Sequence, residues 1–129
     1  MNISQAAQRA GLSSKALRYY ETINLLQPAR GPNGYREYSR DDVETLQFIQ
    51  RARACGFAVE EVRQLLALHR DPARQSHDAK QLVEEKLQQI EQQLQTLKIM
   101  KKTLRGLADS CAGDDSPECA ILSQLANRV

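Results

Sequence analysis

The sequence is poor in the residues that form most metal clusters and active sites. Its 129 residues include three cysteines and two histidines, too few thiols for a four-cysteine iron–sulfur cluster. No pair of carboxylates, no Ser–His set and no glycine-rich phosphate loop is placed for chemistry. We therefore expect that the protein is not an enzyme.

Long apolar runs are lacking as well. The charged fraction of 26% and the mean hydropathy of −0.57 exclude a membrane-spanning helix, and we expect no membrane partner. No signal-peptide pattern precedes the first amphipathic segment. The expected location is the cytoplasm, where thiols remain reduced.

Charge of one sign is scarce at each end of the chain. Residues 1–40 contain six Lys or Arg against only Glu21 and Glu37, whereas residues 109–119 contain four acids and no base. A basic segment attracts polyanions and an acidic loop repels them. The two ends are therefore expected to bind different ligands.

The basic segment predicts two short helices joined by a glycine turn. Ser4 is expected to cap the first helix and Ser13 the second, with Gly11 between them. Helical spacing puts Leu17 and Tyr20 on the inner face of the second helix. Its outer face then carries Ser14, Lys15, Arg18 and Tyr19.

Helix, glycine turn and polar second helix together form the helix-turn-helix pattern. The second helix of such a motif enters the major groove of DNA. Arg18 or Lys15 can donate hydrogen bonds to guanine or phosphate oxygens there, and Tyr19 can reach the backbone. The alternative is an ordinary surface helix, which the segment that follows disfavours.

A turn-rich segment, residues 30–38, follows this motif. Asn33-Gly34 between short extended runs predicts a β-hairpin. Such a wing would present Asn33, Tyr35 and Arg36 to phosphates; without a ligand it is only a surface hairpin. Two more helices are expected, from Ser39 to about residue 56 and over residues 58–68. Residues 1–70 thus predict a winged helix-turn-helix DNA-binding domain.

Residues 71–108 predict a hinge at Asp71-Pro72 and one long helix from about residue 77 to residue 108. The apolar residues of this helix recur at spacings of three and four, which is typical of a heptad seam, with Lys101 as an interruption. A monomer would leave the seam in water, so we expect a homodimer in preference to a long helix that folds back on the DNA-binding domain of its own chain. The seam residues are Val83, Leu87, Ile90, Leu94, Leu97 and Leu104.

Cys111 and Cys119 bracket the acidic loop of the last segment, residues 109–129. Soft thiolates favour Cu(I) and similar ions, whereas structural Zn(II) takes four ligands. No histidine follows His77 and no third cysteine lies in the loop. Two thiolates alone therefore indicate a monovalent d10 ion, Cu(I) first and Ag(I) or Au(I) as alternatives. A disulfide or two inert thiols remain the other interpretations.

The residues before Cys119 predict an activated thiolate. Ser116 can cap a short helix and Pro117 suits its first position, so that Cys119 falls in the first turn. Helix N-termini lower thiol pKa values because their unpaired N–H groups favour negative charge. Cys55, in contrast, is expected to be a small buried residue without a ligand role.

These features occur together in the MerR family of transcription activators, which the chain resembles along essentially its whole length, and above all in the family's copper-efflux and gold-responsive members. Residues 2–4, 11–21, 33–36, 56–57 and 111–119 carry the resemblance. It implies a mainly α homodimer with an antiparallel coiled coil, bound to promoter DNA whose elements are spaced too far apart for RNA polymerase. Metal would then distort the DNA so that these elements realign.

The same resemblance gives roles to four further residues. Ser76, followed by His77, stands where monovalent-ion sensors have Ser and divalent sensors have a third cysteine, although a Ser here can equally cap the next helix. Ala112 and Pro117 resemble the loop of the gold-responsive members. The expected function is activation of metal-efflux or detoxification genes. The alternatives are a redox-responsive activator with a Cys111–Cys119 disulfide and a metallochaperone, which would not need the basic wing.

Overall fold

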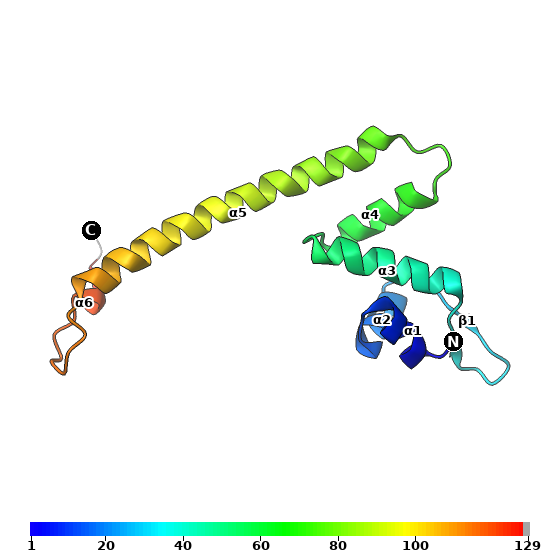
Figure 1. Ribbon diagram of the computed structural model, residues 1–129, viewed down its shortest axis with the longest axis horizontal. Coiled ribbons are helices and arrows are strands. Elements are labelled where there is room, and N and C mark those ends of the chain that lie inside the picture. The colour runs from blue at the N-terminus through cyan, green and yellow to red at the C-terminus, as the bar shows by residue number, and fades with distance from the viewer. Residues whose placement is uncertain (128–129) are drawn as a thin grey trace. The chain divides into compact units, whose positions relative to one another are not determined.

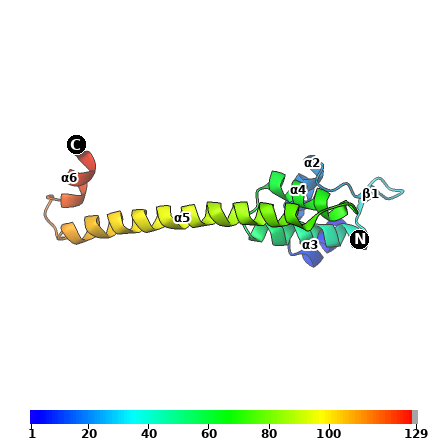
Figure 2. The same cartoon turned by 90° about the horizontal axis from the view of Figure 1, so that it is seen from above.

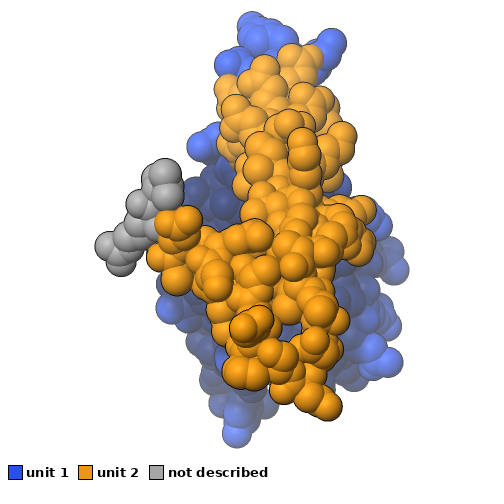
Figure 3. Space-filling view, turned by 90° about the vertical axis from the view of Figure 1, so that its left-hand side faces the viewer, with its two compact units in different colours: residues 1–83 blue, residues 84–129 orange. Residues whose placement is uncertain are grey.

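The computed structural model describes residues 1–127 and is mainly helical, as the sequence predicts (Figure 1). The chain divides into two compact units, Met1–Val83 and Glu84–Val129 (Figure 3). No helix in the described part of the chain is long and apolar enough to cross a membrane. The elements, in order, are α1 (Ile3–Ala10), α2 (Ser14–Thr22), β1 (Ala29–Arg30), β2 (Arg36–Glu37), α3 (Arg40–Ala54), α4 (Val59–Arg70), α5 (Ser76–Ser110) and α6 (Ala120–Ala126).

The first two helices begin at side-chain caps, but only one of these caps is the predicted one. The Ala16 N–H donates to Ser13 Oγ at 3.1 Å, which confirms the cap of α2. The prediction of Ser4 as the cap of α1 is wrong, because Asn2, two residues earlier, forms a reciprocal capping box with Gln5. Gly11 ends α1 in the left-handed conformation at φ 71°, as a tight turn requires.

The core of the first unit is built where α1, α2, α3 and α4 face one another. Small alanines on α1 let this helix approach α3 closely, and α3 contributes larger branched side chains. The predicted inner face of α2 is confirmed. The buried residues on these helices are Ala6, Ala7 and Ala10 of α1, Leu17 and Tyr20 of α2, Val43, Leu46 and Ile49 of α3, and Val62 and Leu66 of α4; Leu25, Leu26, Tyr38 and Phe57 join them from the connecting segments.

The wing is a short antiparallel hairpin, as predicted. β1 pairs with β2 in the register Ala29 with Glu37 and Arg30 with Arg36. The connection is longer than a two-residue turn: the Gly31 N–H donates to the Tyr35 carbonyl, and Gly34 takes a left-handed φ of 82° inside the loop. The Asn-Gly pair therefore marks the hairpin but does not by itself form its turn.

Helices α3 and α4 follow the expected plan with two differences. The Asp42 N–H donates to Ser39 Oγ and the Ser39 N–H to Asp42 Oδ2, so the predicted cap of α3 is a complete capping box. Cys55, which we expected to be buried, is exposed, because α3 ends just before it and the chain turns at Gly56 (φ 90°). Helix α4 extends to Arg70, past the predicted end at residue 68.

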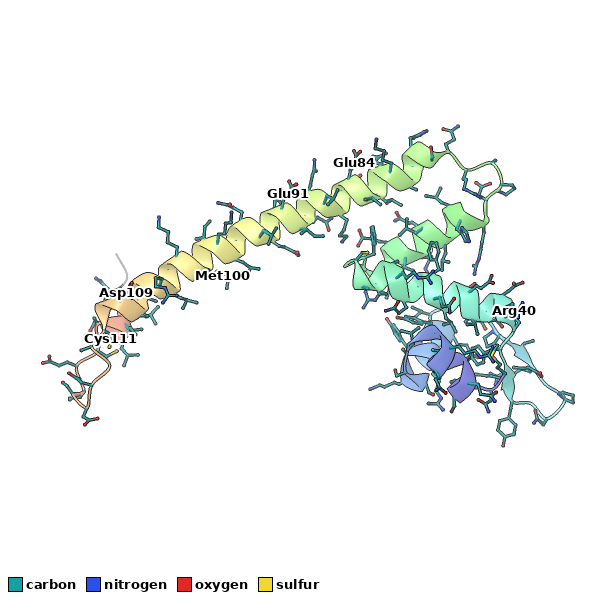
Figure 4. All side chains as sticks on the ribbon, viewed as in Figure 1. Arg40, Glu84, Glu91, Met100, Asp109 and Cys111 are labelled. Atoms are coloured by element: carbon teal, nitrogen blue, oxygen red, sulfur yellow. The ribbon has the colours of Figure 1, made fainter. Side chains whose placement is uncertain are left out.

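Helix α5 is continuous over 35 residues and is longer at both ends than predicted (Figures 1 and 2). None of its residues is buried. Five of the six predicted seam residues are exposed and Ile90 is half-buried. Side chains around Glu91 and Met100 project from the helix into solvent (Figure 4). Its apolar stripe is therefore left uncovered in a single chain.

Candidate functional site

The outer face of α2 carries polar and basic side chains that are free to meet a ligand. Lys15 and Arg18 are exposed, and Tyr19 retains 51% of its accessible surface. Ser14, the first residue of the helix, is half-buried. The inner residues Leu17 and Tyr20 fix this orientation, so the predicted outer face does point away from the core.

The wing presents Tyr35 and Asn33 differently. Tyr35 is 74% exposed, the largest exposed fraction among the exposed large hydrophobic side chains of the described residues. Asn33 is also exposed, but its Oδ1 accepts a hydrogen bond of 3.1 Å from the Tyr35 N–H. Asn33 thus shapes the loop that holds Tyr35 outward.

Arg36 does not project freely as the hairpin pattern suggested. Its Nε donates to Glu21 Oε2 in a close ion pair, and its side chain is only about one-third exposed. The hydrogen bond to Glu21 raises the pKa of Arg36 above its ordinary value. Arg36 is held back because it lies on β2 opposite Arg30, and the guanidinium groups of both residues contact the carboxylate of Glu21 on α2.

The structure brings these predicted residues together around one hollow. Arg18 of α2 and Asn33, Tyr35 and Arg36 of the wing line it, together with the first residues of the chain. Helix and wing, separate in sequence, therefore form one continuous face with exposed cations and aromatic rings. Such a face suits a polyanion with flat bases or phosphates.

The N-terminus is a part of this face that the sequence patterns did not reveal. The Met1 ammonium donates to the Tyr38 carbonyl at 2.9 Å, and the Tyr38 N–H donates to the Met1 carbonyl at 2.8 Å. The Tyr38 ring is buried, and burial raises the pKa of its hydroxyl. The first residue therefore extends the base of the wing, a pairing between segments 37 residues apart that no local pattern encodes.

At the other end of the chain the two loop cysteines converge. The Sγ atoms of Cys111 and Cys119 lie 3.6 Å apart, and both residues are half-buried. This separation is well beyond a disulfide bond of about 2.05 Å, so the thiols are free and adjacent. Cys111 directly follows α5, as its label in Figure 4 shows, and Cys119 directly precedes α6.

Cys119 lies three positions earlier relative to the helix than predicted. Ser116 does not cap α6: its hydroxyl accepts from the Glu118 N–H at 3.2 Å, and its own N–H donates to Asp114 Oδ1. Because these residues form hydrogen-bonded turns within the loop, they do not form the first turn of the helix. Pro117 consequently lies in the loop, and Cys119 itself is the N-cap of α6.

The predicted activation of Cys119 holds in direction despite this shift. The backbone N–H of Leu122 lowers the pKa of the Cys119 thiol, and the Cys111 thiol and the Ile121 N–H act in the same direction, while burial opposes them. The sulfur accepts no full capping hydrogen bond, so the effect is electrostatic attraction from the first turn of α6. The thiolate form is thereby favoured.

The surroundings of the thiol pair offer few other ligands. Ala112 and Pro117 line the same hollow as the two cysteines, which places both predicted loop residues next to the sulfurs. Among residues 1–127 no group of three or more His, Cys, Asp or Glu could hold a metal ion. The donor set is thus two soft sulfurs, which fits a soft ion of low coordination number and does not fit a closed four-ligand zinc site.

Ser76 and His77 occupy the first turn of α5. Ser76 is the first residue of this helix, and His77 Nε2 lies 3.0 Å from Asp78 Oδ1. Both side chains are exposed. Neither residue lines the hollow around Cys111 and Cys119.

Comparisons with known proteins relate the chain to regulators that contain a helix-turn-helix. The family model for MerR HTH family regulatory proteins matches residues 1–68, and the model described as MerR, DNA binding matches residues 43–107. The HTH-type transcriptional regulator HmrR of Rhizobium leguminosarum bv. viciae is 47% identical over 98% of both chains. The HTH-type transcriptional regulator CueR of Yersinia pestis is 43% identical over 98% of this chain and 91% of its own length.

A solved structure is also similar over nearly the whole chain. The transcription regulator PbrR691 from Ralstonia metallidurans CH34, in complex with lead(II), superposes with a TM-score of 0.87 at 32% identity, covering 98% of this chain and 99% of the other. The matched families and relatives are regulators of transcription and not enzymes. The chain belongs to the MerR family of helix-turn-helix transcription regulators.

Proposed function

We propose that this protein is a metal-responsive regulator that binds promoter DNA as a homodimer and senses Cu(I), Ag(I) or Au(I) through the thiolates of Cys111 and Cys119. The observation on which the assignment most depends is the convergence of these two sulfurs at 3.6 Å, while the described residues contain no cluster of three or more His, Cys, Asp or Glu that could hold a metal ion. Two soft sulfurs suit a monovalent d10 ion, Cu(I) first.

The resemblance to a relative solved with a bound metal supports metal binding. The charge of the ion is inferred from the ligands that this chain offers. PbrR691 was solved with lead(II), a divalent ion. In this chain Ser76 stands where, by family resemblance, divalent sensors have a third cysteine. Structural Zn(II) takes four ligands, whereas soft monovalent ions accept fewer, and the loop supplies only two thiolates. A monovalent ion therefore fits the residues present better than a divalent one.

The uncovered apolar stripe of α5 supports a homodimer. The first half of α5 contains four acids and two bases, whereas residues 92–106 contain four bases and no acid. An antiparallel pairing sets the acidic half of one helix against the basic half of the other, and a parallel pairing sets like charges together. Charge thus favours the antiparallel coiled coil that the family resemblance implies.

The same pairing gives Ser76 a place near the metal loop. Ser76 lies one heptad before Val83, the first seam residue, and Cys111 lies one heptad after Leu104, the last. In an antiparallel pair centred on the seam, residue 76 of one subunit is at the level of residue 111 of its partner. A small hydroxyl there, rather than a third thiol, leaves the ion two-coordinate.

In the proposed mechanism the thiolates hold the ion and thereby fix both ends of the loop. α6 then adopts one position, because it begins directly after Cys119. Leu122 and Leu125 of α6 are 66% and 67% exposed, and with Ile121 they are the side chains that would pack against the dimer helix. Ordering the loop biases the dimer between two shapes, and DNA distortion by the activating shape realigns the promoter for RNA polymerase.

A redox-responsive activator is the second candidate. The sulfurs are within about 1.6 Å of bonding distance, and a lowered pKa favours attack by Cys119. This function would require an oxidant in place of a metal. The redox function predicts that reduced protein kept without oxygen does not activate transcription when metal is added, whereas the metal-sensing function predicts that it does.

The deciding experiment is an anaerobic competition titration of reduced protein with Cu(I), Ag(I), Au(I) and Zn(II) against chelators of known affinity. The variants are Cys111→Ser and Cys119→Ser, and Cys55→Ser is the matched control because it removes an exposed thiol outside the loop. We expect one tightly bound monovalent ion per subunit, lost in both loop variants and retained in the control. In vitro transcription with the same proteins then tests activation.

Two results would contradict the proposal. Zn(II) binding as tight as Cu(I) binding would indicate a divalent sensor with ligands outside the two thiolates. Activation of transcription by peroxide without metal, lost in both loop variants, would instead establish the redox function.

A further inference from the structure

One carboxylate on the recognition helix holds both strands of the wing. Glu21 of α2 accepts from Arg36 Nε of β2 in a close pair and from Arg30 Nη2 of β1 at 3.1 Å. Its side chain is 15% exposed, compared with 51% for Arg30, so it lies between the helix and the hairpin. The cluster joins elements that are distant in sequence, and its charge-assisted bonds are stronger than neutral ones.

The contacts around Glu21 extend from the base of the wing toward its tip. Arg30 Nη1 donates to the Gly34 carbonyl at 3.4 Å, which links the cluster to the loop that carries Tyr35. On the other side, Met1 and Tyr38 exchange two backbone hydrogen bonds at the end of β2. The hairpin, with two residues in each strand, has little pairing of its own to fix its direction.

A negative charge at this place is electrostatically unfavourable for binding DNA. Glu21 lies between the exposed face of α2 and the wing, where each added acid repels phosphates and each neutralised Arg weakens attraction to them. Lys15 and Arg18 on α2 and Tyr35 on the wing surround it with groups that suit a polyanion. The advantage of Glu21 must therefore be geometric.

We propose that Glu21 is a positioning residue that sets the wing at a fixed angle to α2, so that base contacts from the helix and backbone contacts from the wing form together on one DNA sequence. Without it the wing still binds phosphates, but no longer in register with α2. Glu21 then raises the ratio of specific to non-specific DNA affinity while lowering the total electrostatic attraction. This inference rests on the DNA binding in the proposed function.

The test compares two carboxylates of the same region. Glu21→Gln and Glu37→Gln each remove one negative charge near the wing, but only Glu21 bridges α2 to both strands. The probes are a duplex selected by the wild-type dimer from a randomised pool and a scrambled duplex of equal length and composition. Binding is measured over a range of salt concentrations, and circular dichroism and Tm check that each head is folded.

Positioning and charge predict opposite results. We expect Glu21→Gln to weaken binding to the selected duplex by about tenfold, the size of one disturbed base contact, while binding to the scrambled duplex stays equal or strengthens. Glu37→Gln should strengthen both alike and keep the ratio. Equal ratios in the two variants would overturn the inference and leave Glu21 an ordinary surface charge.

Glu21→Asp covers the case in which Glu21→Gln does not fold. It keeps the charge but withdraws the carboxylate by one methylene, so the specificity ratio should fall without a change in the salt dependence. A wild-type ratio in this folded variant would also overturn the inference. If the wild-type protein selects no duplex from the pool, the proposed function itself fails, which is a separate outcome.

Discussion

Arg63 Nη2 donates a hydrogen bond of 2.7 Å to the carbonyl oxygen of Ile23 and so joins α4 to the C-terminal end of α2. Nη1 of the same guanidinium lies 3.4 Å from the Asn24 carbonyl. Carbonyl groups at this end of a helix lack partners within the helix, and a cation there also complements the helix dipole. α4 therefore fixes the C-terminal end of the recognition helix α2.

Replacing Arg63 should destabilise the head and leave the second unit intact. Arg63→Ala removes the hydrogen bonds to Ile23 and Asn24, the two residues that follow α2, and we expect it to lower the free energy of unfolding by about 1–2 kcal/mol, toward the low end for charged donors because the side chain is partly exposed. Urea unfolding followed by circular dichroism measures this. Arg70→Ala, on an exposed position of α4, is the control and should change little. Equal losses in both variants would contradict the role of Arg63.

In the DNA-binding domain, the features that depend on residues close in sequence could be predicted from the sequence. The caps at Ser13 and Ser39 could be predicted because each depends on one hydrogen bond between the serine hydroxyl and a backbone N–H three residues later. The error at Ser4 has the same cause, since Asn2 and Gln5 offered a complete capping box and Ser4 only half of one. The pairings of Arg63 with Ile23 and of Met1 with Tyr38 could not be predicted, because folding alone brings these segments together.

Substitutions on α2 and on the wing should affect DNA binding in different ways. Arg18→Ala should weaken binding to a selected duplex by about 1–3 kcal/mol and reduce discrimination among sequences. Tyr35→Ala should weaken binding about equally for all sequences, because a wing residue meets the backbone. Arg51→Ala, an exposed cation on α3, changes the charge as Arg18→Ala does and serves as control.

The salt dependence of the same titrations shows which group Arg18 contacts. Loss of a cation that neutralises a phosphate reduces the slope of log affinity against log salt by about 0.9, whereas loss of a base contact, or of the uncharged Tyr35, leaves the slope nearly unchanged. Unchanged binding in both Arg18→Ala and Tyr35→Ala would show that the face formed by α2 and the wing does not meet DNA.

A charge in the seam of α5 should separate the dimer. Leu97→Glu places a carboxylate in the stripe of each subunit, and an unpaired charge buried there costs about 3 kcal/mol or more, so dimer affinity should fall by at least about a hundredfold. Ile99→Glu is a matched control, because Ile99 is 58% exposed and Leu97 57%, but Ile99 faces away from the seam. Sedimentation equilibrium over a concentration series measures both. Equal dissociation of the two variants would show that the stripe is not the interface.

The thiol loop shows how far sequence reasoning extends in an irregular segment. The spacing of Cys111 and Cys119 predicted a shared site, and the sulfurs do converge. The start of α6 was predicted too early, because Asp114 Oδ1 accepts from the Ser116 N–H and Ser116 Oγ from the Glu118 N–H within the loop, and the helix begins only after Cys119. Side chains that can cap a helix can also close a loop, and the sequence alone does not say which of the two occurs.

The lowered pKa of Cys119 should be visible as reactivity at low pH. The Leu122 N–H and the Cys111 thiol stabilise the thiolate in the folded, metal-free protein, so iodoacetamide should alkylate Cys119 at a lower pH than in the chain unfolded by urea. Because folding depresses this pKa, the thiolate contributes stability that is fully present above the unfolded pKa. That contribution is lost as the pH falls through the folded pKa.

Peptide mass spectrometry after short alkylation pulses gives the pH midpoint for Cys119 alone. In the Cys111→Ser variant the midpoint should rise, since one stabilising neighbour is gone, yet remain below the unfolded value because the Leu122 N–H makes the larger contribution. Metal binding displaces protons from the thiols, so a lower Cys119 pKa also reduces the loss of metal affinity on acidification. A midpoint that is the same in folded and unfolded protein would remove the electrostatic basis for an activated thiolate at the start of α6.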